Sequence, residues 1–309
     1  MSNAKVKVSI IIVNWNRKKD TLECLSALAK NTLPGIEAQI IVIDNASSDG
    51  SVEAIKAFDI KNFDLKLIKN QRNLGFAKPN NQGILAAQVW GADFILLVNN
   101  DLLVSPDLIE KLVSTAKQYP RAGAISPKIY FSKGFEFHKD RYKKGEVGKV
   151  IWYAGGDIDW DNVIGSNHGV DDVDEGQYEK TIETDFATGA CMFLRTEVLK
   201  QVGLFDERYF MYLEDGDLSV RLKKNGWGVF YSPNAHAWHK VAQSSGIGNE
   251  LNDYFIARNR LYFGFKFAPI RAKFALIREA AKLLLTGRIW LRRGARDFFL
   301  LRFGRGSWR

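Results

Sequence analysis

Short apolar runs alternate with amphipathic segments along the first 126 residues of the chain. The runs are rich in Val, Ile and Leu and predict strands at Val6–Val13, Gln39–Ile43, Leu65–Lys69, Phe94–Val98 and Ala122–Ser126. Apolar residues at helical spacing lie between them and predict helices at about Arg17–Lys30, Ser51–Phe58, Asn80–Trp90 and Pro106–Gln118. This alternation predicts an α/β fold, with a mainly parallel sheet flanked by helices on both faces.

Polar residues stand at or just after the ends of the first four predicted strands. They are Asn14, Asp44, Asn73 and Asn99–Asp101. Ligands of such sheets bind outside the carboxyl ends of the strands. The pattern therefore predicts a ligand site that is built from these side chains.

The strand–helix alternation stops after Ser126. Three polar segments predict loops, the first of them a possible mobile lid: Lys133–Lys149, Gly155–Gly156 and Asp171–Glu175. Regular structure is predicted again as a strand, bend and strand, then a short helix, then a strand, at Thr184–Leu194, Glu197–Val202 and Gly228–Tyr231.

The stretch FDERYFMYLEDGDLSVRLKKNGW concentrates three acidic residues, Glu214, Asp215 and Asp217. Leu218 and Leu222 follow at helical spacing, which predicts a helix with the carboxylates in its first turn, where the helix dipole stabilises anions. Aromatic and apolar residues precede the carboxylates, and such surroundings raise a carboxylate's pKa toward that of a useful base. A surface helix with a charged first turn is the alternative.

The C-terminal part of the chain predicts basic amphipathic helices. Leu251–Phe267 is aromatic-rich and helical, and from Arg271 onward apolar residues recur near helical spacing with Arg and Lys between them. Such helices lie in the membrane interface with their cations toward anionic lipid, and Trp290 and Trp308 are candidate anchors. A helix packed on its own domain, with a solvated basic face, is the alternative.

Charge is unevenly distributed along the 309 residues. The formal net charge is +9, but residues 258–309 carry 14 Lys and Arg against 2 Asp and Glu, so the rest of the chain has a net charge of −3. The basic C-terminal region therefore predicts a partner of its own.

Two cysteines, Cys24 and Cys191, are too few for a disulfide framework and fit a reducing compartment. With no recognisable signal peptide and no run of eighteen apolar residues, we expect a cytoplasmic protein without a membrane span.

Seven segments together carry a family resemblance. They are SIIIVNWN, VIDNASSDGS, NLGFAKPNNQGI, FILLVNNDLLV, DFATGACMFLRTEVLKQVGLFDE, FMYLEDGDLSVRL and ARNRLYF. In order and spacing they resemble the family 2 glycosyltransferases of the GT-A fold, and most of all the rhamnosyltransferase-like branch of bacterial cell-surface polysaccharide synthesis. The resemblance implies an inverting, divalent-metal-dependent transfer of a sugar, with rhamnose as a candidate, from a nucleoside-diphosphate donor to a glycan or lipid-linked saccharide acceptor.

The same resemblance implies a domain division. A GT-A domain would occupy residues 1–250, with a nucleotide-sugar-binding half at about 1–127 and an acceptor-binding and catalytic half at 128–250. Residues 251–309 would form a C-terminal helical basic extension.

Site residues follow from the positions that match the family's motifs. Asp215 matches the catalytic base, and Glu214 is its acidic neighbour near the acceptor. Four residues fall at the nucleotide site, with Asp44 matching the aspartate that holds the donor's base: Asn14, Asp44, Asn73 and Asn99. Three fall at the acceptor pocket: Gly189, Ala190 and Trp152.

A metal site is implied at Asn99 and Asp101, which occupy the positions of the family's DxD motif. His239 matches a histidine that completes the metal shell in some relatives. A strand-end carboxylate with neighbouring oxygen ligands suits Mg²⁺ or Mn²⁺, which usually bridge substrate phosphates. Asn99 departs from the strict motif and leaves the choice of metal open, and Asn99-Asn100-Asp101 taken alone is also a common turn.

The implied partners are a TDP-, UDP- or GDP-sugar donor, a glycan or polyprenyl-linked saccharide acceptor, and an anionic membrane surface at the inner face of the cell membrane. No nucleic acid is expected, because a nucleic-acid-binding protein would explain the basic tail but not the acidic cluster. A dehydrogenase or a sugar nucleotidyltransferase would need a glycine-rich loop after the first strand, where the sequence has IIVNWNRKKD. Asn99 keeps open a catalytically weak or inactive relative that acts as a membrane-associated scaffold.

Overall fold

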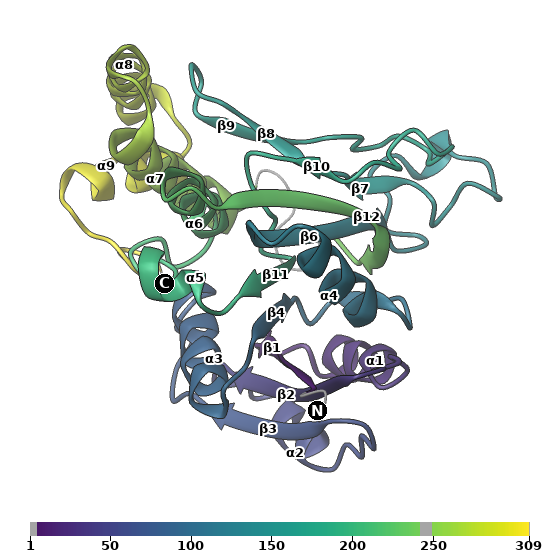
Figure 1. Ribbon diagram of the computed structural model, residues 1–309. Helices are drawn as coiled ribbons and strands as arrows, with labels where there is room; N and C mark the ends of the chain where they lie inside the picture. The colour runs from purple at the N-terminus through teal and green to yellow at the C-terminus, as the bar shows by residue number, and fades with distance from the viewer. Residues whose placement is uncertain (1–4, 242–248, 309) are drawn as a thin grey trace.

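A ten-stranded sheet forms the centre of the computed structural model, which describes residues 5–241 and 249–308 (Figure 1). Its strands are β1 (Val6–Asn14), β2 (Ile36–Asp44), β3 (Asp64–Lys69), β4 (Phe94–Val98), β5 (Leu102–Val104), β6 (Ala122–Phe131), β7 (Ile151–Tyr153), β10 (Ile182–Glu183), β11 (Cys191–Arg195) and β12 (Gly228–His239). The order along the sheet is β10-β12-β6-β11-β4-β1-β2-β3, with β5 paired to β12 and β7 paired to β6.

The amino-terminal half of the sheet is parallel. Strand β1 pairs in parallel with β2 and β4, and β2 pairs in parallel with β3. Strand β11 runs antiparallel to both β4 and β6, and the long β12 returns parallel to β6. The predicted α/β fold with a mainly parallel sheet is confirmed.

Helices cover both faces of this sheet. Alternate strand residues point to opposite sides, and apolar residues on both sides need to be buried. In β1, Val8, Ile10 and Ile12 contribute to one apolar cluster and Ile11 to the other. The first cluster includes residues of α1 (Lys18–Leu28), α2 (Ser51–Lys56) and α4 (Leu108–Gln118). The second includes residues of α3 (Ala77–Trp90), α5 (Val198–Val202) and α6 (Glu214–Lys224). In α6, Leu218 and Leu222 are buried as the sequence predicted.

The second half of the chain departs from the prediction in three places. Only the second arm of Thr184–Leu194 is a strand, because Thr184 and Asp185 make isolated backbone hydrogen bonds to Val229 and Gly156 and no continuous ladder. Strand β12 continues past Tyr231 to His239 through a register shift between Ser232 and His236. A hairpin of β8 (Gly156–Asp159) and β9 (Ile164–Asn167) begins at the second glycine of the predicted Gly155–Gly156 loop, and no strand was predicted there. Residues 133–149 form the predicted loop, with a single short 3₁₀ helix at Lys139–Arg141 among the described residues.

Three C-terminal helices stand beside α6 at one end of the sheet (Figure 1). They are α7 (Glu250–Phe267), α8 (Ile270–Thr286) and α9 (Ile289–Phe299). Trp290 is only 3% exposed and packs with Tyr254 and Phe255, and its ring lies 4.7 Å from that of Trp308. The prediction that Trp290 is an interfacial anchor is therefore wrong, because the tail uses this ring as core. Within residues 5–241 and 249–308, none of the helices is both long enough and apolar enough to span a bilayer.

Helix α7 carries two polar side chains that fix the loop before α6. Arg258 is fully buried, and its guanidinium donates to the carbonyls of Arg208 (3.2 Å) and Tyr209 (2.7 Å) in this loop and of Gly304 (2.6 Å) in the C-terminal segment. Asn259 Nδ2 donates to the carbonyls of three loop residues, Tyr209, Met211 and Tyr212, at 2.7–3.0 Å. These bonds attach the loop and the C-terminal segment to the same buried point.

Replacing Arg258 with Met changes the side-chain volume little but removes the guanidinium that holds the loop and the C-terminal segment. The variant leaves buried carbonyls without donors, and each such loss costs about 1–3 kcal/mol. We expect the free energy of unfolding, measured in guanidinium chloride, to fall by roughly 3–5 kcal/mol. Arg302→Met, at an exposed side chain, is the matched control and should change stability little. Equal stability of the two variants would contradict the role of Arg258.

Candidate functional site

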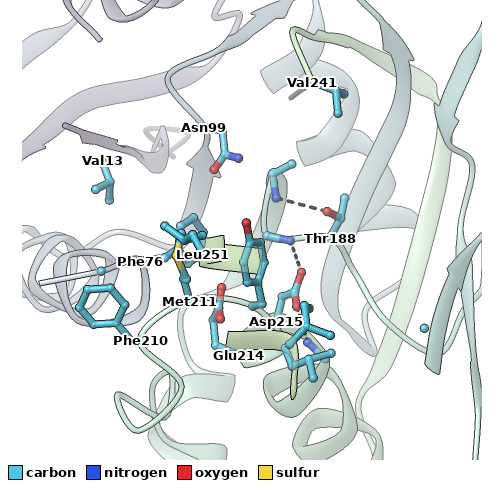
Figure 2. Close-up of a pocket in the computed structure, with 18 of the residues that line it drawn as sticks. Val13, Phe76, Asn99, Thr188, Phe210, Met211, Glu214, Asp215, Val241 and Leu251 are labelled. Atoms are coloured by element: carbon cyan, nitrogen blue, oxygen red, sulfur yellow. Dashed lines mark hydrogen bonds between the residues drawn. The ribbon is translucent and has the colours of Figure 1, made fainter. Parts of the chain in front are cut away.

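A cavity of about 960 Å³ opens at the carboxyl ends of β1 and β4 and reaches the first turn of α6. Figure 2 shows Val13 and Asn99 from the strand ends on one side of it, and Glu214 and Asp215 from α6 on the other. Nine of the predicted site residues line it: Asn73, Asn99, Asp101, Trp152, Gly189, Ala190, Glu214, Asp215 and His239. Residues from both halves of the chain therefore meet in one cavity.

The other two predicted residues, Asn14 and Asp44, lie behind the wall of this cavity. Both are buried, and Asn14 Nδ2 donates to Asp44 Oδ2 at 2.8 Å. Asp44 Oδ1 also accepts from the backbone N–H of Ser47 at 2.9 Å. The neighbouring Asn45 lines the cavity instead, and its side chain donates to the carbonyl of Gly75 at 2.8 Å. The pair Asn14–Asp44 thus braces the ends of β1 and β2 beneath the surface that a ligand would meet.

Asp101 lies in the turn between β4 and β5, and His239 is the last residue of β12. Their side chains meet in the cavity. Asp101 Oδ1 lies 3.2 Å from His239 Nε2, and the ring of Trp152 stands edge-on to His239 at 4.6 Å. Asp101 Oδ1 and His239 Nδ1 are buried, and apart from the contact between Asp101 and His239 Nε2 neither atom has a hydrogen-bond partner among the described residues. Buried polar atoms are nearly always satisfied, so these two atoms are available to bind a ligand.

The described residues do not supply a complete metal site by themselves. Across 5–241 and 249–308, no group of three or more His, Cys, Asp and Glu side chains is arranged to hold a metal ion. Asp101 and His239 are two suitable ligands, and Asn99 lines the cavity beside them with an amide oxygen. Mg²⁺ and Mn²⁺ commonly take one or two protein carboxylates and fill the remaining positions with water and substrate phosphates. The residues present therefore fit a metal that is shared with a diphosphate ligand.

Asp215 is held by backbone donors at the edge of the cavity. Its Oδ2 accepts from the N–H of Gly189 at 2.8 Å (Figure 2), and its Oδ1 accepts from the N–H of Gly216 at 2.8 Å. A side chain at Gly189 would meet the ring of Phe76 at 3.2 Å and Asp215 Cβ at 3.4 Å. Gly189 therefore allows the carboxylate of Asp215 to approach the strand end closely.

The two neighbouring carboxyls differ in their electrostatic surroundings. Burial, and then the charge of Asp215, raises the pKa of Glu214 well above its ordinary value of 4.5, and Glu214 Oε2 has no hydrogen-bond partner among the described residues. Burial also raises the pKa of Asp215, while the N–H groups of Gly189 and Gly216 counteract the shift. Asp215 has the N–H groups of both Gly189 and Gly216 to favour its ionised form, whereas the pKa of Glu214 is raised further by the charge of Asp215, so Asp215 is the carboxyl of the pair that ionises more readily.

Asp217, the third acid of the cluster, is used for structure. Its carboxylate accepts from Arg221 Nε (2.6 Å), Lys266 Nζ (2.5 Å) and Tyr209 Oη (3.0 Å). It is fully buried within these bonds and does not line the cavity. Asp217 therefore ties α6 to α7, and two of the three acids remain for a ligand.

Several lining residues were not found from the sequence. Tyr212 and Leu213 belong to the aromatic approach, whose place beside Glu214 was the signal for them. Val163 and Ile164 come from the β8–β9 hairpin, and Arg305 and Trp308 come from the C-terminal segment. The last four are more than 45 residues from Asp215 in the chain, and no local pattern indicates such contacts.

Two family profiles match the chain. Glycosyl transferase family 2 matches residues 9–203, and Glycosyl transferase family group 2 matches residues 160–302. The N-acetylglucosaminyl-diphospho-decaprenol L-rhamnosyltransferase of Mycobacterium tuberculosis is 29% identical over 252 residues, which are 75% of this chain and 78% of that protein. The low-salt glycan biosynthesis hexosyltransferase Agl10 of Haloferax volcanii is 26% identical over 263 residues, 82% of this chain and 76% of that one.

Solved glycosyltransferase structures share the fold at low sequence identity. GalNAc-T7 with UDP, GalNAc and Mn²⁺ superposes with a TM-score of 0.60 and 18% identity over 83% of this chain, which spans about half (51%) of that one. TarS residues 1–349 of S. aureus with UDP-GlcNAc gives 0.59 and 16%, over 96% and 81% of the two chains. Mannosyltransferase PcManGT from Pyrobaculum calidifontis with GDP-Man and Mn²⁺ gives 0.56 and 16%, over 96% and 75%. The chain therefore belongs to glycosyl transferase family 2 and is a rhamnosyltransferase-like glycosyltransferase with the GT-A fold.

Proposed function

We propose that this glycosyltransferase is inverting and metal-dependent, with Asp215 as its catalytic base. The observation that carries the proposal is the meeting, in one cavity, of the Asp215 carboxyl, which accepts from two N–H groups, and the Asp101–His239 pair with its unpartnered polar atoms. A base on one side and an anion-stabilising site on the other are the two elements that a single displacement needs.

The donor is a nucleoside-diphosphate sugar in this proposal. TarS and PcManGT were solved with UDP-GlcNAc and GDP-Man, which supports a donor of this class for the shared fold. Asn73 and Asn99, which line the cavity, would contact the nucleotide, and the buried pair Asn14–Asp44 would support the strand ends beneath it. UDP, TDP and GDP are the candidate nucleotides, and TDP-rhamnose is favoured by the likeness to an L-rhamnosyltransferase.

Asp101, His239 and Asn99 are the residues that would hold Mg²⁺ or Mn²⁺ in the donor site. GalNAc-T7 and PcManGT were solved with Mn²⁺, which supports a divalent ion for this fold. When bound, such an ion neutralises the diphosphate and makes it a better leaving group.

Asp215 performs the proton transfer of the proposed reaction. Its carboxylate takes the proton of the acceptor hydroxyl while the hydroxyl oxygen forms a bond to the anomeric carbon, on the face opposite the diphosphate. The bond from the anomeric carbon to the diphosphate oxygen breaks, and the diphosphate leaves with the electron pair. Glycosidases need a second, protonated carboxyl for their leaving group, whereas a diphosphate leaves without one. Glu214 keeps its proton and thereby keeps the negative charge of the pair on Asp215.

The acceptor is proposed to be a glycan or a polyprenyl-linked saccharide. By its name, the M. tuberculosis relative acts on a sugar carried on a diphospho-decaprenol, which supports an acceptor of this kind. Gly189, Ala190 and Trp152 would border it.

We further propose that the chain divides into a GT-A domain at residues 1–250 and a helical extension at 251–309. The enzyme is proposed to be cytoplasmic and to associate peripherally with the inner face of the cell membrane.

Asp215→Asn should abolish transfer and leave nucleotide binding intact. Asn keeps an oxygen that can accept from Gly189 N–H but has no basicity, so we expect turnover to fall about a thousandfold. Sugar transfer and nucleotide affinity would be measured on the same preparation. Asp64→Asn, at an exposed carboxylate of β3, is the control. Turnover near the wild-type rate in Asp215→Asn would rule out its role as base.

Asp101→Asn should weaken Mn²⁺ binding to the protein loaded with a nucleoside diphosphate, by roughly tenfold or more. Asn99→Asp restores an acidic first position and should strengthen it. Free Mn²⁺ can be counted by electron paramagnetic resonance, so the test does not depend on activity. Wild-type Mn²⁺ affinity in Asp101→Asn would contradict the metal site, and an inactive wild type would then favour the scaffold alternative.

Glu214→Gln should change how stability depends on pH. The folded state keeps a proton on Glu214 above pH 4.5, where the unfolded chain releases it, so this group lowers wild-type stability as pH rises toward its folded pKa. The Gln variant lacks that loss, and its stability relative to wild type should increase from pH 4.5 to pH 8 in guanidinium chloride unfolding. The exposed Glu53→Gln should show no such trend. A parallel pH dependence of Glu214→Gln and wild type would mean that Glu214 is ionised in the folded protein.

A further inference from the structure

Exposed apolar side chains are concentrated in the C-terminal helices. Among the described residues, eight of the fifteen large apolar side chains that are exposed lie between Ile270 and Leu301. Four of them belong to α8: Ile270 (68% exposed), Phe274 (66%), Ile277 (42%) and Leu285 (80%). Their spacing of four, three and eight residues places them on one face of the helix. We call these four residues the α8 stripe.

The α8 stripe is not the face by which α8 packs on the protein. Ala272, Leu276 and Ala280 are the buried residues of the helix, and they share an apolar cluster with Val163 and Phe263. Leu276 reaches so close to α7 that a side chain at Gly264 would overlap it. Helix α8 therefore has two apolar faces, of which the packed one already holds the helix in place.

Unpaired cations flank the α8 stripe on both sides. Lys273 lies along one edge, and Arg278 and Lys282 lie along the other. Within residues 5–241 and 249–308, the side chains of these three residues make no ion pair and no hydrogen bond. Glu279, the acidic residue of α8, is neutralised by Arg260 at 2.6 Å. The surface around the stripe therefore presents apolar side chains between positive charges.

Helix α8, which carries the stripe, is attached to one wall of the cavity. Arg271 pairs with Asp161 at 2.5 Å, which links α8 to the tip of the β8–β9 hairpin. Val163 and Ile164 of this hairpin line the cavity, and Ile164 is half exposed. In Figure 1, α8 lies at the outer edge of the molecule with the hairpin beside it. A flat surface against the stripe would thus lie near the hairpin that forms part of the cavity wall.

We infer that the α8 stripe docks on an anionic lipid bilayer and brings the cavity to lipid-linked acceptors. This rests on the proposed function, because a lipid-linked acceptor gives the bilayer its purpose. Apolar side chains enter the acyl boundary while Lys273, Arg278 and Lys282 meet anionic headgroups. A second copy fits this surface less well, because a two-fold contact would place like charges opposite each other. The buried Trp290 has no part in the docking.

Vesicle co-sedimentation tests the inference directly. Wild type should bind phosphatidylcholine vesicles that contain phosphatidylglycerol far better than vesicles of phosphatidylcholine alone. Phe274→Gln/Ile277→Gln/Leu285→Gln should lower the partition coefficient by roughly tenfold or more. Lys273→Gln/Arg278→Gln/Lys282→Gln should remove the preference for the anionic lipid. Leu85→Gln/Val89→Gln, at exposed apolar residues of α3, is the matched control and should bind as wild type does.

Two further readouts separate docking from folding and from catalysis. Nucleotide binding and the melting temperature of the stripe variant should match wild type, since the stripe is exposed. Transfer to a water-soluble acceptor analogue should be unchanged, while transfer to a lipid-linked acceptor in vesicles should fall. Unchanged vesicle binding of the stripe variant would overturn the inference. A wild type that sediments as a dimer, with a stripe variant that sediments as a monomer, would overturn it as well. If wild type transfers to neither acceptor, the proposed function fails while vesicle binding still decides the docking.

Discussion

The hydrogen bonds from Arg258 and Asn259 to the loop before α6 are the constraint on which the candidate site depends. Phe210, Tyr212 and Leu213 all have positive φ, between 67° and 70°, and a non-glycine residue in this region costs on the order of 1–3 kcal/mol. The buried donors of α7 offset this strain by taking up the loop carbonyls. Without these hydrogen bonds the loop would relax to another conformation, and Glu214 and Asp215 in the first turn of α6 would no longer be held in the cavity.

The same loop joins α3 to the C-terminal helices. The carbonyl of Phe210 accepts from the N–H groups of Phe76 and Ala77 at the start of α3, so α3 is attached to the loop directly. On its other side, Asp217 is bonded to Lys266 of α7. The proposed catalytic carboxylate, the start of α3 and the C-terminal helices are therefore all connected through this loop. This explains why the tail contributes Trp308 and Arg305 to the cavity wall.

Local patterns predicted most of the fold and the centre of the site, because strand ends and the first turn of α6 are set by short segments. Long-range placement could not be predicted. Nothing local tells that Asn14 bonds Asp44 behind the wall, or that the β8–β9 hairpin and Trp308 border the cavity. In α8, helical periodicity merges two apolar faces into one signal, and only packing of Leu276 on α7 separates the buried face from the exposed Phe274.

The central claim is that the cavity at the strand ends binds a nucleoside-diphosphate donor together with a divalent metal. The most direct measurement is the melting temperature of the protein with UDP, TDP or GDP, each with and without Mn²⁺. A ligand that binds only the folded state raises the melting temperature by mass action. We predict a rise for one nucleotide that Mn²⁺ enlarges. An unchanged melting temperature with all three nucleotides, with and without Mn²⁺, would contradict the claim.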